Sequence, residues 1–310
     1  MAYRYLFGPV CSRRLGVSLG VDLVPLKTCT FNCVYCECGR TTSLTGERRE
    51  YVPTGQVIAE IDGYLATIPD LDYVTFAGSG EPTLHSGIGE IISFIKDRYP
   101  RYRVAVLTNG ALLGDPDVST ALMRADLVIP SLDAVSEEIF QEISRPCPGL
   151  TAGDVLEGLT TFAREFEGEI WLEVFIVPGQ NDTEEEILRL RDAIAAIGPD
   201  RIQVNTLDRP GAEIWVRPAS PLALERIAAV LCGDAEVIGA VCMDRALPPK
   251  TGEATDLLLA TIRRRPCTID DLVGTLGLRP AEISKYLRVL EAEGRIEQVK
   301  EKRGIFYRAV

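Results

Sequence analysis

Three cysteines near the start of the sequence have the spacing of an iron–sulfur ligand set. Cys29, Cys33 and Cys36 are separated by three and two residues. Three thiolates this close in sequence can bind three irons of a 4Fe–4S cluster, which leaves the fourth iron without a protein ligand. An iron with an open position can bind a small molecule and deliver an electron to it. The motif therefore predicts redox chemistry at this loop.

Two other uses of closely spaced cysteines remain open from spacing alone. A zinc site normally has four Cys or His ligands, and Cys38 is the nearest fourth candidate. The chain has one histidine, His85, which lies almost fifty residues further on. Structural disulfides are rare in cytoplasmic proteins, and nine cysteines are an odd number. Metal ligands and free thiols are therefore favoured over a disulfide framework.

Composition indicates a globular protein with more than one domain. The chain has 310 residues, of which 46% are hydrophobic, enough for a large core. No apolar run reaches the roughly 18 residues of a membrane span, and the N-terminus has no signal-peptide pattern. We therefore expect a cytoplasmic protein with no membrane partner.

Strand-like and helix-like stretches alternate through most of the chain. Helical segments show apolar residues at three- and four-residue steps, as in Ile88, Ile91, Ile92 and Ile95. Six β-rich runs each precede such a helical pattern, at residues 17–24, 73–77, 103–108, 127–132, 170–177 and 201–207. Six strand-then-helix units predict a parallel sheet with right-handed crossovers. The predicted class is α/β, a partial (β/α)6 barrel over residues 1–231.

Unusual residues follow the predicted strands, where barrels gather functional groups. Gly78 and Gly80 follow the second strand and allow close approach of backbone to a ligand. Asn109 ends the third strand, although an Asn-Gly pair is also a common turn. Ser131 and Asp133 end the fourth strand on one face. A helix cap formed by Asp133 or Ser136 is the alternative for that segment.

The cysteine motif together with residues 77–83, Ala-Gly-Ser-Gly-Glu-Pro-Thr, resembles the radical S-adenosylmethionine (SAM) superfamily. The resemblance covers roughly the first 230 residues. It implies that SAM chelates the open iron and that an electron from the cluster cleaves it to a 5′-deoxyadenosyl radical. It also implies an external flavodoxin- or ferredoxin-like electron donor. The cofactor-binding residues implied are Tyr35, Gly78, Gly80, Glu81, Asn109, Ser131 and Asp133.

Finer motifs resemble a wyosine-type branch related to 4-demethylwyosine synthase. They are residues 8–16, 23–29, 39–42 and 205–210. The chain departs from that branch by having cysteine at Cys11, Cys38 and Cys147. If these three converge at the mouth of the barrel, they predict a second Fe–S cluster of the kind that binds substrate in the synthase. Isolated buried cysteines, or ligation by Cys232 with Cys242, are the alternatives.

Polar residues inside apolar strands are further candidates. Glu173 interrupts a strongly apolar run, where an ionised carboxylate needs a partner such as Arg145 or Arg201. Gln203 and Asn205 share one strand face and would contact substrate or SAM if that face lines the barrel. Schiff-base chemistry would need a desolvated lysine, for which Lys27 is nearest. A contact of Lys27 with backbone or a carboxylate is the simpler expectation.

The C-terminal residues form a second unit. The sequence predicts a linker at residues 232–250, with a short strand at 236–241. It predicts three helices and a hairpin at residues 251–310. Two helices across a Gly-containing turn, followed by a wing, resemble a winged helix-turn-helix domain. This unit holds 11 Lys and Arg against 9 Asp and Glu, whereas residues 1–250 hold 22 against 36. The two units therefore predict different partners.

A nucleic-acid partner and a protein partner are both compatible with this domain. The third helix and the wing offer side chains for phosphate contacts, namely Ser284, Lys285, Arg288, Lys300, Lys302 and Arg303. Acidic neighbours and the negative barrel oppose a polyanion. The sequence predicts a radical SAM enzyme whose winged helix recruits a macromolecular substrate such as tRNA or a protein. A cluster-bearing transcriptional regulator is the alternative.

Overall fold

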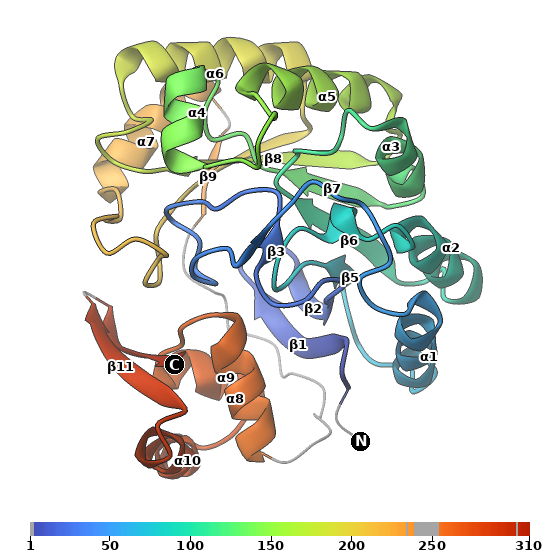
Figure 1. The fold of residues 1–310 in the computed structure, drawn as a ribbon, viewed down its shortest axis with the longest axis vertical. Helices are drawn as coiled ribbons and strands as arrows, with labels where there is room; N and C mark the ends of the chain where they lie inside the picture. The colour runs from blue at the N-terminus through green and yellow to red at the C-terminus, as the bar shows by residue number, and fades with distance from the viewer. Residues whose placement is uncertain (1–2, 234, 239–253, 302) are drawn as a thin grey trace.

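The computed structural model describes residues 3–233, 235–238, 254–301 and 303–310. A single mixed sheet forms the centre of the larger unit (Figure 1). Six of its strands run parallel to one another, each with its neighbours in the order of the chain. They are β2 (Gly16–Val21), β5 (Tyr73–Phe76), β6 (Arg103–Thr108), β7 (Leu127–Pro130), β8 (Glu169–Ile176) and β9 (Arg201–Thr206). The predicted partial (β/α)6 barrel is confirmed.

Two further strands form the edges of this sheet. Strand β1 (Leu6–Ser12) pairs antiparallel with β2, and β10 (Glu236–Val237) pairs parallel with β9. The predicted short strand at 236–241 is therefore seen at its first two residues, and residues 239–241 lie outside the described part. Two short strands, β3 (Thr28–Cys29) and β4 (Ser43–Leu44), pair with each other in the loop after β2. That loop contains the cysteine motif.

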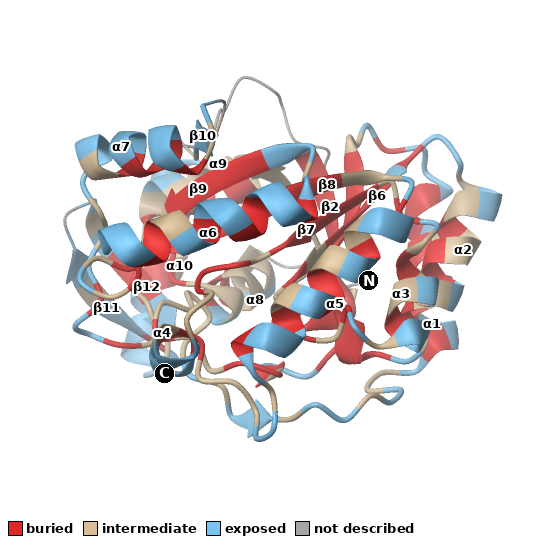
Figure 2. Ribbon diagram, turned by 90° about the horizontal axis from the view of Figure 1, so that it is seen from above, coloured by how far each residue is buried: buried red, intermediate tan, exposed pale blue. Residues whose placement is uncertain are grey.

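Helices cover the outer face of the sheet and bury one face each (Figure 2). Their apolar repeat explains this arrangement, because α2 buries Ile88, Ile91, Ile92 and Ile95 at three- and four-residue steps. The helices of this layer are α1 (Thr54–Leu65), α2 (Ile88–Arg98), α3 (Pro116–Leu122), α4 (Glu137–Ile143), α5 (Ala152–Glu165), α6 (Glu184–Ile197) and α7 (Pro221–Leu231). No helix of the described residues is long and apolar enough to span a bilayer.

The turn between β1 and β2 crosses to the far side of the open barrel. Arg14 pairs with Glu173 of β8, and Arg13 lies 4.0 Å from Asp208, just after β9. Leu15, in the same turn, packs in an apolar cluster inside the barrel. The turn therefore connects the β1 side of the sheet to β8 and to the end of β9.

The C-terminal unit has the predicted winged-helix elements. They are α8 (Ala254–Arg264), α9 (Ile269–Leu276), α10 (Pro280–Ala292), β11 (Ile296–Glu301) and β12 (Gly304–Ala309). Leu258, Leu272, Leu287 and other apolar residues form a core separate from that of the barrel. In Figure 1 this unit lies beside β1, and α9 contacts β1. The winged helix is therefore docked on the barrel.

Candidate cluster and cofactor site

The three cysteines of the motif lie together in the loop after β2. Their thiols are near enough for the charge of Cys36 to raise the pKa of both Cys29 and Cys33, after the larger effect of burial. Burial, with the nearby charge of Glu81, raises the pKa of Cys29 to about 12. Iron binding must therefore displace protons from these buried thiols.

Cys36 differs from the other two thiols. A hydrogen bond from Cys38 and the ammonium of Lys27 lower the pKa of Cys36 to about 5, although burial opposes this. The Lys27 Nζ donates to the Cys36 Sγ at 3.1 Å. These contacts favour the thiolate form of Cys36, which is the form that binds metal. The expected contact of Lys27 with backbone or a carboxylate is wrong, because its ammonium faces the Cys36 sulfur.

The geometry differs from that of a mononuclear metal site. Among the described residues, no three Cys, His, Asp or Glu side chains are arranged around one ion position. In a 4Fe–4S cluster each cysteine binds a different iron, so the sulfurs surround a cube instead of a point. Three neighbouring thiols, one of them with a lowered pKa, are a donor set that fits such a cluster.

Tyr35 joins the cysteine loop to the barrel. Its ring stacks on Phe175 of β8, with centroids 4.0 Å apart, and its hydroxyl donates to Asp133. The other oxygen of Asp133 accepts the backbone N–H of Phe175 at 2.8 Å. Burial raises the pKa of Asp133 to about 7. Asp133 therefore anchors Tyr35 and does not cap α4. Ser136, the other residue of the helix-cap alternative, is the N-cap residue of α4, without a side-chain hydrogen bond to the helix end.

The glycine-rich segment after β5 packs tightly against the cysteine loop. A Cβ on Gly80 would lie 1.8 Å from the carbonyl oxygen of Thr28, the residue before Cys29. Gly78 has a φ of +139°, and a Cβ there would meet the carboxylate of Asp22. Only glycine fits at both positions. The backbone of this segment is therefore held beside the cluster loop, where a cofactor on the open iron would lie.

Glu81, which the resemblance implies as a cofactor-binding residue, makes several hydrogen bonds within the protein. Its side chain is 2% exposed, and both oxygens accept hydrogen bonds within the protein. The donors are Thr83, the Thr108 hydroxyl and the backbone N–H of Asn109. Both oxygens are thus used to join the loops after β5 and β6.

Asn109 and Ser131 lie where the sequence predicts. The Asn109 amide donates to the Thr30 hydroxyl at 2.7 Å and to the Cys29 Sγ at 3.5 Å. Ser131 forms an isolated bridge with Glu173 and is half-buried, on the face of β7 that lines the barrel. Asn109 therefore contacts a cluster ligand, and Ser131 faces the interior.

A polar group lies inside the barrel at the level of Ser131. The carboxylate of Glu173 pairs with Arg14 and accepts from the Asn205 amide at 3.4 Å. The expected partners Arg145 and Arg201 are wrong, because Arg145 pairs with Glu213 and Arg201 with Glu236. Sequence reasoning missed Arg14, since 159 residues separate it from Glu173. The position of Glu173 within an apolar strand indicated only that the carboxylate needs a cationic partner, and did not indicate which residue provides it.

Gln203 supplies an unused acceptor in the same interior. It is 2% exposed, and its Oε1 has no hydrogen-bond partner in the described structure. Its chain neighbours Ile202 and Val204 pack into the core under the helices, so Gln203 faces the opposite side, the barrel interior. A buried acceptor without a partner costs free energy, which a bound group with an N–H or O–H would recover.

Two of the three cysteines of the predicted second cluster, Cys11 and Cys38, lie apart along β2, while Cys147 lies beside the cysteine loop, where its backbone N–H donates to the Thr30 carbonyl. The Cys38 thiol donates to the Gly78 carbonyl at 3.6 Å and lies close enough to Cys36 for the two thiols to shift each other's pKa, so it belongs to the first loop. Cys11 pairs with Val17 near the start of β2. Gly78 lies beyond the other end of that strand, at least four residues or roughly 13 Å away. This separation depends on the register of β1 against β2, which no local sequence pattern indicates. Cys242 lies outside the described residues.

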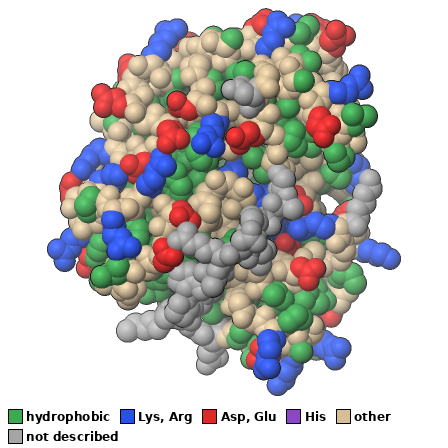
Figure 3. Space-filling view, turned by 180° about the vertical axis from the view of Figure 1, so that it is seen from behind, with side chains coloured by type: hydrophobic (Ala, Val, Ile, Leu, Met, Phe, Trp, Pro, Cys, Tyr) green, Lys and Arg blue, Asp and Glu red, His purple; other side chains and the backbone are tan. Residues whose placement is uncertain are grey.

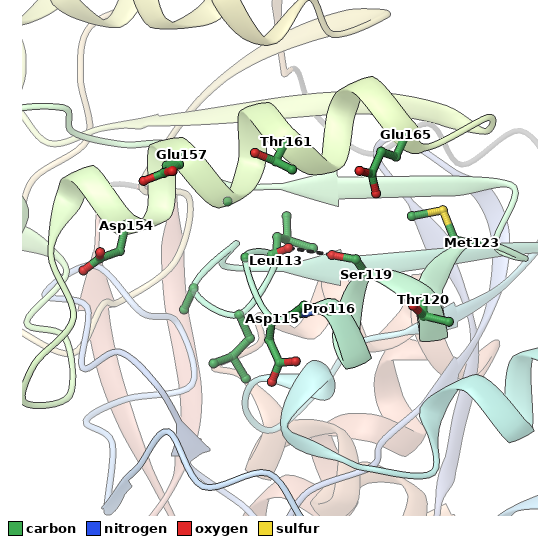
Figure 4. A pocket seen from close by; sticks show the side chains of 14 residues that line it. Leu113, Asp115, Pro116, Ser119, Thr120, Met123, Asp154, Glu157, Thr161 and Glu165 are labelled. Atoms are coloured by element: carbon green, nitrogen blue, oxygen red, sulfur yellow. Dashed lines mark hydrogen bonds between the residues drawn. The ribbon is translucent and has the colours of Figure 1, made fainter.

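A cavity on the outer surface of the barrel lies apart from this site. It has a volume of about 1010 Å³ and lies between α3 and α5 on the outer surface (Figure 4). Ser119 donates to the Leu113 carbonyl there, and Asp115, Asp154, Glu157 and Glu165 give it an acidic rim. No cysteine or glycine of the candidate site lines it. This cavity is therefore separate from the candidate cluster and cofactor site.

Comparison with known proteins gives two family matches. Residues 23–191 match the model of the radical SAM superfamily, and residues 241–302 match the DprA winged helix domain. A UPF0026 protein of Methanocaldococcus jannaschii is 34% identical over 75% of this chain and 72% of its own length. A Brachyspira hyodysenteriae protein named GTPase Obg is 41% identical over 66% of this chain, but the match spans only 30% of that protein.

A solved structure shares the fold. The radical SAM methyltransferase from Sphaerobacter thermophilus aligns with a TM-score of 0.55 and 16% identity, over 71% of this chain and 65% of its own. Identity at this level indicates a common fold and not a common reaction.

The contact of Gly80 with the cysteine loop gives a first prediction. Replacing Gly80 by Ala places a methyl group against the Thr28 carbonyl, which forces the loop away. We expect iron bound after anaerobic reconstitution to fall from about four per chain to less than one. Gly55→Ala is the matched control, because a Cβ there meets nothing within 4 Å. Equal iron content in the two variants would contradict the proposed packing.

Proposed function

This chain belongs to the radical SAM superfamily and is a radical SAM enzyme, and we propose that Cys29, Cys33 and Cys36 hold the 4Fe–4S cluster at which it cleaves SAM. The observation that carries the assignment is the convergence of the three thiols beside the backbone of the glycine-rich segment. With SAM bound, such a cluster supplies one electron that splits SAM into methionine and a 5′-deoxyadenosyl radical. A flavodoxin- or ferredoxin-like protein is the proposed source of that electron.

The chain's own residues bind and orient the reacting groups. Asn109 and Lys27 donate to the cluster ligands Cys29 and Cys36. Tyr35, fixed by Asp133 and Phe175, forms one wall of the pocket. The backbone of Gly78–Gly80 presents polar groups for the amino group of SAM, and Ser131 faces its ribose and carboxylate. Glu173, Asn205 and Gln203 lie deeper in the barrel and would contact the substrate.

Cleavage of SAM is the direct test. Wild-type protein, reconstituted anaerobically and reduced with dithionite, should convert SAM to 5′-deoxyadenosine, detected by chromatography. The Cys29/Cys33/Cys36 triple Ala variant should form none above background, because it lacks the ligands for iron. Cys232→Ala, at the end of α7, is the control and should keep wild-type activity. Absence of 5′-deoxyadenosine from the wild-type reaction, or an equal yield from the triple variant, would refute the assignment of these cysteines as the cluster ligands for SAM cleavage.

We further propose one cluster per chain. The geometry supports this, because Cys38 contacts the first loop while Cys11 lies near the opposite end of β2. Reconstituted wild-type protein should bind about four irons, and a Cys11/Cys38/Cys147 triple Ala variant should bind about the same number. About eight irons that fall to about four in this variant would instead establish the auxiliary cluster. The wyosine-type relationship stays a prediction of the sequence motifs.

For the winged helix we propose recruitment of a nucleic-acid substrate. Lys285 and Arg288 lie three residues apart on the exposed face of α10, and Lys300 projects from the wing. Arg303 is less available than predicted, because it pairs with Asp208 and Asp271, and Lys302 lies outside the described residues. Figure 3 shows acidic and basic side chains interspersed on the rear face of the molecule. Neither family match supports the regulator alternative.

Salt dependence tests this role. Unfractionated tRNA should bind the wild-type protein, and a Lys285/Arg288/Lys300 triple Ala variant should bind at least about tenfold more weakly. The variant's plot of log affinity against log salt should be shallower by about two to three units of slope, since each phosphate contact releases about one counterion. An Arg164/Arg191/Arg226 triple Ala variant removes the same charge from exposed positions of the barrel helices as a control. Equal tRNA binding by both variants would exclude this surface as the tRNA-binding site and would favour a protein partner for the winged helix.

A further inference from the structure

The winged helix contacts the two loops that form the cofactor site. Arg264, the last residue of α8, extends toward the barrel, with its guanidinium 4.6 Å from the ring centroid of Phe7. Its Nε lies 3.6 Å from the Oδ2 of Asp22, the residue after β2. Only 21% of the Arg264 side chain and 9% of the Asp22 side chain are exposed. This ion pair is therefore sheltered between the domains.

Asp22 in turn holds the glycine-rich segment. Its carboxylate accepts hydrogen bonds from both the backbone N–H and the hydroxyl of Ser79. It also fills the space that a side chain on Gly78 would take. A buried carboxylate needs a countercharge, and Arg264 is the cation paired with it. The position of the Gly78–Gly80 backbone thus depends on a residue of the C-terminal domain.

A second connection reaches the cysteine loop. Asp271, in the first turn of α9, accepts two hydrogen bonds from Arg209, at 2.5 and 3.2 Å. Arg209 is 4% exposed, and its Nε lies 3.4 Å from the carboxylate of Glu37. Glu37 is the residue between Cys36 and Cys38. The winged helix is therefore joined to the cluster loop through Asp271, Arg209 and Glu37.

A cleft and a pocket lie where the domains meet. Cys38 lines both, together with residues of α8. The pocket, of about 210 Å³, is bounded by Gly78 on one side and by Arg264 and Arg265 on the other. The C-terminal domain thus supplies one wall directly beside the glycine-rich segment and the cysteine loop.

We propose that the winged-helix domain completes the SAM-binding site, with Arg264 and Asp271 as its positioning residues. Arg264 fixes the glycine-rich segment through Asp22, and Asp271 fixes the cluster loop through Arg209 and Glu37. Neither residue touches SAM in this scheme, and each acts through the loop that it holds. The inference rests on the proposed function in that SAM is the ligand.

The dissociation constant for SAM tests the proposal. It is measured by equilibrium dialysis on the full-length, anaerobically reconstituted protein, together with iron content and unfolding temperature. Arg264→Ala should weaken SAM binding about tenfold with iron content unchanged, because the cysteines keep their places while the glycine-rich segment loosens. Arg263→Ala is the matched control, since it removes the same charge from the neighbouring exposed residue. The control should bind SAM as the wild type does.

Two further variants separate positioning from general stability. The single variant Asp22→Asn should weaken SAM binding. The Arg264→Ala/Asp22→Asn double variant should bind SAM no more weakly than the weaker-binding single variant, because both substitutions remove the same connection. Should Arg264→Ala fail to fold, Arg264→Lys keeps the charge and is expected to bind with intermediate affinity.

The SAM-binding results distinguish failure of the proposed function from failure of the positioning role of Arg264. Wild-type protein that fails to bind SAM overturns both the proposed function and this inference. Tight binding by the wild type, with Arg264→Ala equal to Arg263→Ala, overturns the positioning role alone. Multiplying effects of Arg264→Ala and Asp22→Asn would also overturn it, because independent residues act additively in free energy.

Discussion

The site depends on pairing most of the polar groups that the barrel buries where its parallel strands end. Parallel strands end at the same edge, so the loops after β2, β5, β6 and β7 meet there and bring thiols, carboxylates and amides together. Such groups are costly to bury without partners. Glu81 shows the solution most clearly, because its two oxygens accept bonds from the loops after β5 and β6. These pairs fix the shape of the mouth.

The cysteine loop is held from several directions by the same principle. Asn109 contacts Cys29, Lys27 contacts Cys36, and the ring of Tyr35 stacks against Phe175. Gly80 approaches its backbone more closely than any side chain would allow. A loop fixed by so many independent contacts keeps the three thiols in place before any iron arrives. This preorganisation lowers the entropic cost of assembling a cluster.

The C-terminal domain extends this network beyond the barrel. Arg264 and Arg303 meet the carboxylates of Asp22 and Asp208 of the barrel, and Asp271 meets Arg209, so the contact is polar and partly sheltered from water. Breaking one partner of a sheltered ion pair leaves an uncompensated charge, which costs more than the pair contributes. A domain attached in this way is part of the site's architecture, while α10 keeps an exposed face for another molecule.

The sequence by itself determined the local features. Apolar periodicity predicted the six parallel strands, their helices and the winged helix, because these patterns depend on near neighbours in the chain. Cysteine spacing predicted the cluster, since its ligands lie within eight residues. Tertiary structure alone decided which distant residues meet. Strand register placed Cys11 far from Cys38, the β1–β2 turn brought Arg14 to Glu173, and domain docking brought Arg264 to Asp22. Such pairs are set by the packing of whole elements, which no local pattern records.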